Sequence, residues 1–125
     1  MRIWFNHWFS TAVHLIALLR QDWGDVEIIG SHPQEWAAYQ YACDRWGIEP
    51  DIQGQVYAFW CLDFAREQQV DVFVPWQGLR DIAAIQNEFT AAGIKVLVPK
   101  AGKILSVLSD KAATYDWLKN VRPEL

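Results

Sequence analysis

The sequence predicts an α/β fold in which a four-stranded parallel sheet lies between two layers of helices. Short apolar runs of strand character alternate along the chain with stretches whose apolar residues recur at helical spacing. Strands that alternate with helices are joined by right-handed crossovers, so they lie parallel. With 125 residues, 52% of them hydrophobic, the chain has the size and composition of one domain with one core.

The N-terminal half predicts two strands and three helices. Ser10 is the expected N-cap of the first helix, because its hydroxyl can accept from the unpaired amides of the first turn. The second helix runs through Trp36 and Tyr41 and ends near Gly47. The expected elements are, in order, a strand over 2–5, a helix from Ser10, a strand over 26–30, the helix ending near Gly47, a loop over 48–54 and a helix through Val56 and Phe64.

The C-terminal half contains the clearest strand, over residues 70–75, whose nearly unbroken apolar run is typical of a strand covered on both faces. The elements expected after it are a helix over 82–92, a strand over 94–98, a short helix over 101–108 and a last helix over 111–120. The predicted strand order is 2-1-3-4. Residues 1–108 would then form the domain, and residues 109–125 a helix that leads out of it.

Composition excludes several classes of function. The chain has 15 acidic and 11 basic residues, and the basic ones are scattered, which argues against binding nucleic acid. No apolar run is long enough to cross a membrane and no signal-peptide layout follows the first residues. Cys43 and Cys61 are too few for a disulfide framework and are expected to be buried thiols in a reduced compartment. A cytoplasmic protein is therefore expected.

A ligand site is expected where the strand order reverses, between the first and third strands, because ligands of open parallel sheets gather at the carboxyl ends there. Ser31, His32, Pro99 and Lys100 flank this point. The residues that follow the two strands are Asn6, His7, Trp8, Pro75, Trp76 and Gln77.

The chemistry at these strand ends is limited. No glycine follows the first strand, so the dinucleotide fingerprint is absent, as is a phosphate-binding Gly-Lys-Ser/Thr loop. The amides of Ser10 and Thr11 could receive a carboxylate or phosphate oxygen, which is a general property of helix starts. No catalytic residue is assigned, since a Cys61 nucleophile would lie far in sequence from both histidine loops.

Two pairs of side chains leave alternatives open. His7 and His32 could form a metal or proton-transfer pair, but two loop imidazoles that bond to backbone are the favoured interpretation, and no third metal ligand has suitable spacing. Trp8 and Trp76 could stack on a flat ligand or cover a partner domain. We favour the simpler interpretation, that both cap the apolar core.

Taken together, these segments resemble one family. Residues 2–6 with 10–12 are similar to the start of ATP-grasp carboxylate-amine ligases, as are residues 71–75 with 93–98. Ser109-Asp110-Lys111 with Thr114-Tyr115 resembles the Asp-Lys helix start that leads into the ATP-grasp fold. The resemblance covers essentially the whole chain and corresponds to the Rossmann-like pre-ATP-grasp domain at the N-terminus of such enzymes, akin to those of carbamoyl-phosphate synthase and biotin carboxylase.

The resemblance implies a substrate-side role without catalysis by this chain alone. In the family, ATP and Mg²⁺ are held by later domains, so this chain would bind no cofactor by itself. Lys111 matches the start of the helix that leads into the ATP-grasp fold and is the one residue assigned to the cofactor-binding side. It does not match the lysines that grip the phosphates. The implied substrate-binding residues, for a small carboxylate or amine, are Asn6, His7, Trp8, Ser10, Thr11, Ser31, Pro75, Trp76, Gln77 and Arg80.

Three functions therefore stand as alternatives. The first is the N-terminal domain of an ATP-grasp ligase, with the ATP-grasp domain in the same or a separate chain. The second is a free-standing module that binds a small anion or nucleotide. The third is a Trp-rich interaction domain whose last helix docks a partner. Tyr115, Trp117 and Leu118 are expected either to pack back on the sheet layer or to form a homodimer contact, since large apolar patches rarely stay bare.

Overall fold

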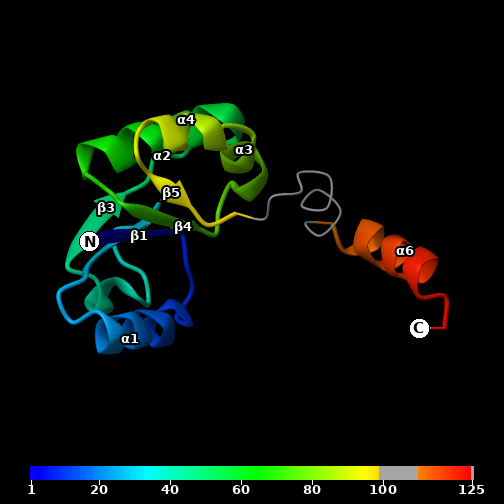
Figure 1. The fold of residues 1–125 in the computed structure, drawn as a ribbon, viewed down its shortest axis with the longest axis horizontal. Helices are drawn as coiled ribbons and strands as arrows, with labels where there is room; N and C mark the ends of the chain where they lie inside the picture. Colours follow the sequence, from blue (N-terminus) through cyan, green and yellow to red (C-terminus); the bar gives the residue numbers. More distant parts are fainter. Residues whose placement is uncertain (99–109, 125) are drawn as a thin grey trace.

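The structure, a computed structural model, describes residues 1–98 and 110–124 and has a parallel sheet at its centre (Figure 1). Within these residues the sheet has five strands in the order β3-β2-β1-β4-β5. The strands are β1 (Arg2–Asn6), β2 (Glu27–His32), β3 (Arg45–Ile48), β4 (Val72–Pro75) and β5 (Lys95–Val96). The helices are α1 (Ala12–Asp22), η1 (Gln40–Ala42), α2 (Gly54–Glu67), α3 (Leu79–Ala84), α4 (Gln86–Ala91) and α6 (Lys111–Val121).

Helices cover the sheet on both faces, which confirms the expected three layers. Figure 1 shows α1 on one side of the strands and α2, α3 and α4 on the other. Because side chains alternate along a strand, β1 serves both layers. Ile3 and Phe5 pack with α1, whereas Trp4 packs with α2 and stacks on Phe73 of β4 at a centroid distance of 3.9 Å.

The prediction of four strands is wrong, because residues 45–48 form a strand where a helix end was expected. This strand, β3, pairs with β2 at the edge of the sheet, with Gly30 opposite Trp46. A Cβ on Gly30 would lie 2.6 Å from both the Cys43 Sγ and a Trp46 ring carbon. The missing side chain thus makes room for the indole. The other four strands keep the predicted relative order.

Two of the expected helices have other boundaries in the structure. α1 begins at Ala12, and Thr11 rather than Ser10 is its N-cap residue, without a side-chain capping bond. The helix expected over 82–92 is divided into α3 and α4 at Ile85, whose φ of −110° and ψ of 23° are not helical. The last helix is confirmed as α6, but the helix expected over 101–108 lies outside the described residues.

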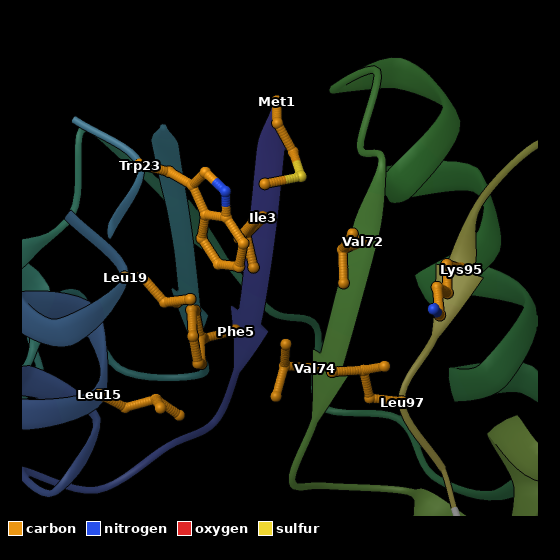
Figure 2. A pocket seen from close by; sticks show the side chains of 10 residues that line it. All are labelled: Met1, Ile3, Phe5, Leu15, Leu19, Trp23, Val72, Val74, Lys95 and Leu97. Carbon is orange, nitrogen blue, oxygen red and sulfur yellow. The ribbon is translucent and has the colours of Figure 1, made fainter. Parts of the chain in front are cut away.

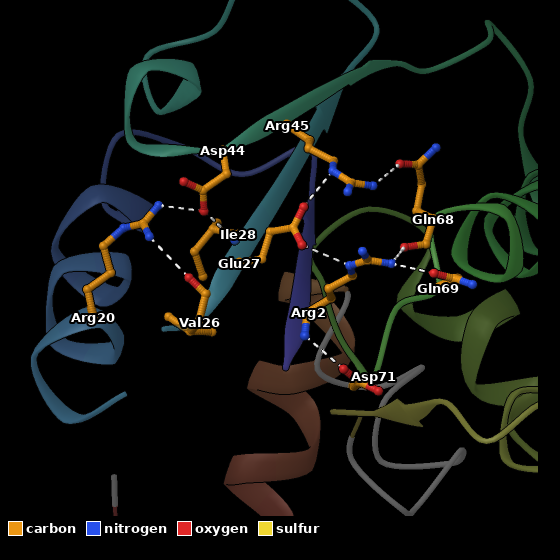
Figure 3. Close-up of polar contacts among 10 residues, drawn as sticks. All are labelled: Arg2, Arg20, Val26, Glu27, Ile28, Asp44, Arg45, Gln68, Gln69 and Asp71. Carbon is orange, nitrogen blue, oxygen red and sulfur yellow. Dashed lines mark hydrogen bonds and ion pairs between the residues drawn. The ribbon is translucent and has the colours of Figure 1, made fainter. Parts of the chain in front are cut away.

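Charged side chains connect the amino ends of the strands (Figure 3). Glu27 accepts from Arg2 Nε at 2.8 Å and pairs with Arg45 Nε at 2.5 Å, so one carboxylate links β1, β2 and β3. The backbone amide of Arg2 donates to Asp71 ahead of β4. These groups are partly exposed, so each pair contributes little stability and mainly favours this strand register.

An apolar pocket of about 300 Å³ opens on the α1 face of the sheet (Figure 2). Leu19 and Trp23 line it from α1 and the turn after it, Ile3 from β1, and Val74 and Leu97 from the other half of the sheet. α1 therefore covers β1 and β2 more fully than β4 and β5. None of the helices in the described ranges is long and apolar enough to cross a bilayer.

Candidate functional site

Buried polar side chains gather at the carboxyl ends of the strands. Asn6 ends β1, Ser31 lies near the end of β2, and Glu49 directly follows β3; all three are at most 3% exposed. Tyr57, in the first turns of α2, reaches the same point and is also buried. The carboxyl ends of parallel strands lie side by side along the same edge of the sheet. Residues far apart in sequence therefore meet here.

Glu49 is the acceptor on which this cluster converges. Its Oε1 accepts from Ser31 Oγ at 2.7 Å, and its Oε2 accepts from the Tyr57 hydroxyl at 2.9 Å. Ser31 Oγ in turn accepts from Trp4 Nε1. Each hydroxyl has a single proton and uses it in a hydrogen bond to Glu49. Both carboxylate oxygens therefore act as acceptors, which suits an ionised carboxylate. Burial raises the pKa of Tyr57 above its usual range, which keeps its hydroxyl a donor.

Asn6 holds the loop after β4 against this cluster. Its Nδ2 donates to the Tyr57 hydroxyl at 2.7 Å and to the Gln77 carbonyl at 3.0 Å, and its Oδ1 accepts from the Trp76 amide at 2.6 Å. The Asn6 side chain is fully buried, and these three hydrogen bonds occupy its amide group. It therefore positions the loop, and the backbone of Gln77 rather than its side chain takes part.

His7 lies next to Glu49 and has an unusual backbone conformation, with φ of 53°. Its amide donates to the Ser31 carbonyl at 2.8 Å, which joins the end of β1 to β2. Its Nδ1 is buried, has no hydrogen-bond partner, and lies 3.6 Å from Glu49 Oε2. A residue that pays the strain of the left-handed region at a sheet edge is a functional candidate.

His32 lies beside His7, as expected, with ring centroids 4.4 Å apart. Its Nδ1 accepts from the Gln34 amide, so in the neutral ring the proton is on Nε2. Burial, and then the neighbouring His7, lower the pKa of His32, while Glu49 opposes them. Across the described ranges no three His, Cys, Asp or Glu side chains gather as a metal site.

The aromatic residues form a cluster on the same edge. Trp8 Nε1 donates to the Val74 carbonyl, and its ring packs against Phe5 and Trp76. Trp8 therefore caps the core, as favoured above. Trp76 and Phe9 stay about half exposed with their rings 5.1 Å apart, so this cluster keeps an open face.

Several predicted substrate-binding residues lie away from the buried cluster. Ser10, Thr11 and Arg80 are exposed, and Lys111 is exposed at the start of α6. The first amides of α1 are already bonded, since Ala12 and Val13 donate to the carbonyls of Phe9 and Ser10. The amides named in the prediction are those of Ser10 and Thr11, and their binding of an anion stays a prediction. Pro75 ends β4, and Lys100 and Pro99 fall outside the described residues.

The two cysteines are unsuited to nucleophilic chemistry. Burial raises the pKa of Cys43 to about 12. Burial also raises the pKa of Cys61, a fully buried residue of α2. A thiol must ionise to attack, so neither is activated. Cys43 lies after η1 and not in a helix that continues to Gly47, which corrects the sequence-based placement.

Sequence reasoning missed Glu49 and Tyr57, the two residues at the centre of the site. Glu49 was assigned to a loop because β3 was not recognised as a strand. Only once β3 is recognised as a strand does Glu49 fall at the carboxyl ends of the sheet, where ligands bind. Tyr57 falls inside the helix that was expected through Val56 and Phe64, and its hydroxyl gave no separate indication of a site.

Comparison with known proteins gives similarity at the level of structure. No protein-family model and no curated protein matches the sequence. The biotin carboxylase subunit of a pyruvate carboxylase is 18% identical with a TM-score of 0.64, over 95% of this chain and 27% of that one. The biotin carboxylase domain of a thermophilic 2-oxoglutarate carboxylase, bound to bicarbonate, is 15% identical with a TM-score of 0.64, over 95% and 27%.

A complete multifunctional pyruvate carboxylase from Rhizobium etli is also similar, at 16% identity and a TM-score of 0.57. The match covers 96% of this chain and 12% of that one. The chain thus spans between 12% and 27% of the length of these three chains. Nearly all of it is nevertheless aligned, and the part it matches is their N-terminal region. The chain therefore has the fold of the N-terminal, pre-ATP-grasp domain of biotin carboxylases.

Proposed function

We propose that this chain is the N-terminal, substrate-side domain of an ATP-grasp ligase and is not catalytic alone. In such an enzyme ATP activates a carboxylate as an acyl phosphate, which an amine or thiol then attacks. The observation that carries the proposal is the alignment of 95% of this chain with 27% of a biotin carboxylase chain. The remaining parts of the reaction, including ATP and Mg²⁺ binding, would come from an ATP-grasp domain in the same or a separate chain.

The position of α6 supports this assignment. Asp110 caps α6 by accepting from the amides of Ala112 and Ala113, as the Asp-Lys helix start of the family would. Tyr115 and Trp117 are 68% and 41% exposed, so α6 presents aromatic surface for a following domain. In this proposal the edge around Glu49 and His7 faces the acceptor substrate.

The test is calorimetric titration of the chain with Mg-ATP. Because the nucleotide site would lie in the ATP-grasp domain, no heat of binding is expected. Micromolar binding of ATP by this chain alone would overturn the assignment and favour a free-standing nucleotide-binding module.

A protein-interaction domain is the second candidate, and the exposed face of α6 favours it. Because α6 does not bury Trp117 against described residues, the remaining sequence-based expectation is a homodimer contact. Light scattering should show a dimer that Trp117→Ser converts to a monomer. A wild-type monomer would count against this candidate, and Trp23→Ser, at another half-exposed tryptophan, serves as the control.

A further inference from the structure

The charge of the polar cluster determines which ligand it suits. Glu49 is a buried carboxylate whose two hydrogen-bond donors, Ser31 and Tyr57, are neutral hydroxyls. Among residues 1–98 and 110–124, His7 is the one basic side chain within ion-pair distance of it. A buried anion without a full counter-charge attracts cations and repels anions. The edge therefore favours an ammonium group over a carboxylate.

The orientation of His7 makes it a proton acceptor toward solvent. Its Nδ1 is buried and turned to Glu49, whereas 32% of its side chain is exposed, so the exposed part lies away from Nδ1. A carboxylate beside Nδ1 holds the proton on that nitrogen and leaves Nε2 with a free lone pair. The distance of 3.6 Å is longer than a hydrogen bond, as is common for such pairs before a ligand binds.

The surroundings add features that suit an amine. Trp76 and Phe9 keep half-exposed aromatic faces on the same edge, and aromatic faces attract ammonium groups. The nearby His32 has its Nδ1 occupied by the Gln34 amide, so in its neutral ring Nε2 carries the proton and cannot accept one from the ligand. Arg80, the cation expected to bind a carboxylate, is exposed on α3 and has no bond to the cluster.

We propose that His7 and Glu49 form an amine-binding site in which His7 Nε2 takes a proton from the ammonium group of the ligand. The ammonium loses one proton and becomes a neutral amine with a free lone pair, and His7 becomes an imidazolium. The adjacent Glu49 carboxylate compensates the new positive charge. His7 contacts the ligand, and Glu49 is a positioning residue that sets the His7 tautomer. The inference rests on the proposed function in that this amine would be the nucleophile for the acyl phosphate.

The experiment is an NMR titration of the ¹⁵N-histidine-labelled chain with methylammonium chloride and, separately, sodium acetate. The chain has three histidines, so single substitutions assign the imidazole signals, and the exposed His14 is an internal control. We expect His7 to carry its proton on Nδ1 without ligand. Methylammonium, in the millimolar range, should shift the His7 Nε2 signal. Acetate should leave it in place.

Glu49→Gln tests the positioning role, because it removes the charge and keeps the shape. It should weaken methylammonium binding at least tenfold, the factor that corresponds to about 1.4 kcal/mol, and release the His7 tautomer. Glu27→Gln is the matched control, since Glu27 is a partly buried carboxylate at the opposite edge of the sheet and should leave binding unchanged.

Three results would overturn the proposal: a wild-type His7 with its proton on Nε2, a response to acetate in place of methylammonium, or unchanged binding in a folded Glu49→Gln chain. If Glu49→Gln does not fold, the wild-type tautomer and the comparison of the two salts decide the matter. Mg-ATP binding would separately overturn the ligase-domain assignment and leave this amine site standing.

Discussion

The hydroxyl of Tyr57 belongs to two hydrogen bonds that join three elements. It donates to Glu49 after β3 and accepts from Asn6 at the end of β1, while its backbone belongs to α2. Asn6 continues the connection to the loop after β4. A single atom in a buried position thereby couples the packing of α2 to the geometry of the site.

Replacing Tyr57 by Phe should destabilise the protein by about 1–3 kcal/mol, because it leaves the buried Glu49 carboxylate with one donor fewer and Asn6 with an unpaired N–H. Urea unfolding followed by circular dichroism measures the change. Tyr41→Phe is the control, since Tyr41 is 78% exposed and should stay within about 0.5 kcal/mol of wild type. Equal stability of the two variants would contradict the importance of this hydroxyl.

The lowered pKa of His32 makes stability depend on pH. Below about pH 6.5 the unfolded chain binds a proton at this histidine more readily than the folded chain does, so acid favours unfolding. The free energy of unfolding should therefore fall as the pH is lowered from about 7.5 to 5.5.

His32→Gln should flatten this pH dependence, whereas His14→Gln, at an exposed position in α1, should preserve the slope. Urea midpoints across the same pH range provide the measurement. If both variants keep the wild-type slope, another group governs it.

At the scale of elements, the strands with continuous apolar runs were predicted well and the edge strand was not. β1 and β4 lie at the centre of the sheet, so burial on both faces leaves an unambiguous apolar run. β3 has four residues, none of them fully buried, with half-buried side chains in the middle and exposed ones at both ends. Trp36, Ala37, Tyr41 and Ala42 before it imitate helical spacing. Pairing with β2 overrides that local pattern, and no window of the sequence contains this information.

The failure to recognise β3 from local sequence also explains which residues of the candidate site were missed. Asn6, His7 and Ser31 were located correctly at strand ends because their strands were recognised. Glu49 entered the site only through β3, and Tyr57 only through the packing of α2 on the sheet. The position of the site was therefore predictable, whereas its buried charge was not.

The contact between β2 and β3 requires a glycine at position 30. Gly30→Ala would place a Cβ 2.6 Å from the Cys43 Sγ and from the Trp46 ring, so the ring must move. We expect a loss of about 1–3 kcal/mol in the free energy of unfolding. Gly24→Ala is the matched control, because its Cβ would approach no atom closer than 4.0 Å. A neutral Gly30→Ala would show that β3 can shift freely.

Loss of the N-terminal cap of α6 should weaken this helix without affecting the stability of the sheet. Asp110→Ala removes the acceptor of two first-turn amides and should weaken α6 by about 1 kcal/mol. Hydrogen exchange of the α6 amides should accelerate while that of β1 stays unchanged. Asp116→Ala, within the helix, should not accelerate exchange, since alanine favours helix.

At the scale of the whole molecule, α6 and the sheet behave as separate units. Figure 1 shows α6 apart from the strands, none of its residues is buried, and its capping bonds come from Asp110. The core clusters consist of residues from the sheet and from α1, α2, α3 and α4. The predicted boundary after residue 108 lies among residues that the structure does not describe and stays a prediction.

Removal of residues 109–125 should leave the free energy of unfolding within about 0.5 kcal/mol of the full chain, because none of the described residues 110–124 belongs to a core cluster. Urea unfolding of the two chains, followed by circular dichroism, tests this directly. A markedly less stable short chain would mean that α6 packs back on the sheet layer, the other arrangement that the sequence permits.

The placement of β1 at the centre of the sheet has a consequence for the order of events on the ribosome. β1 is made well before β4, one of its two neighbours in the sheet, and Arg2 meets Asp71 at a separation of 69 residues. At about 5–20 residues per second, β1 waits roughly 3–14 s for that partner while the chain grows. During this interval Trp4 lacks the ring of Phe73 on which it stacks. One side of this aromatic strand therefore stays without its neighbour in the sheet until residues 72–75 have been made.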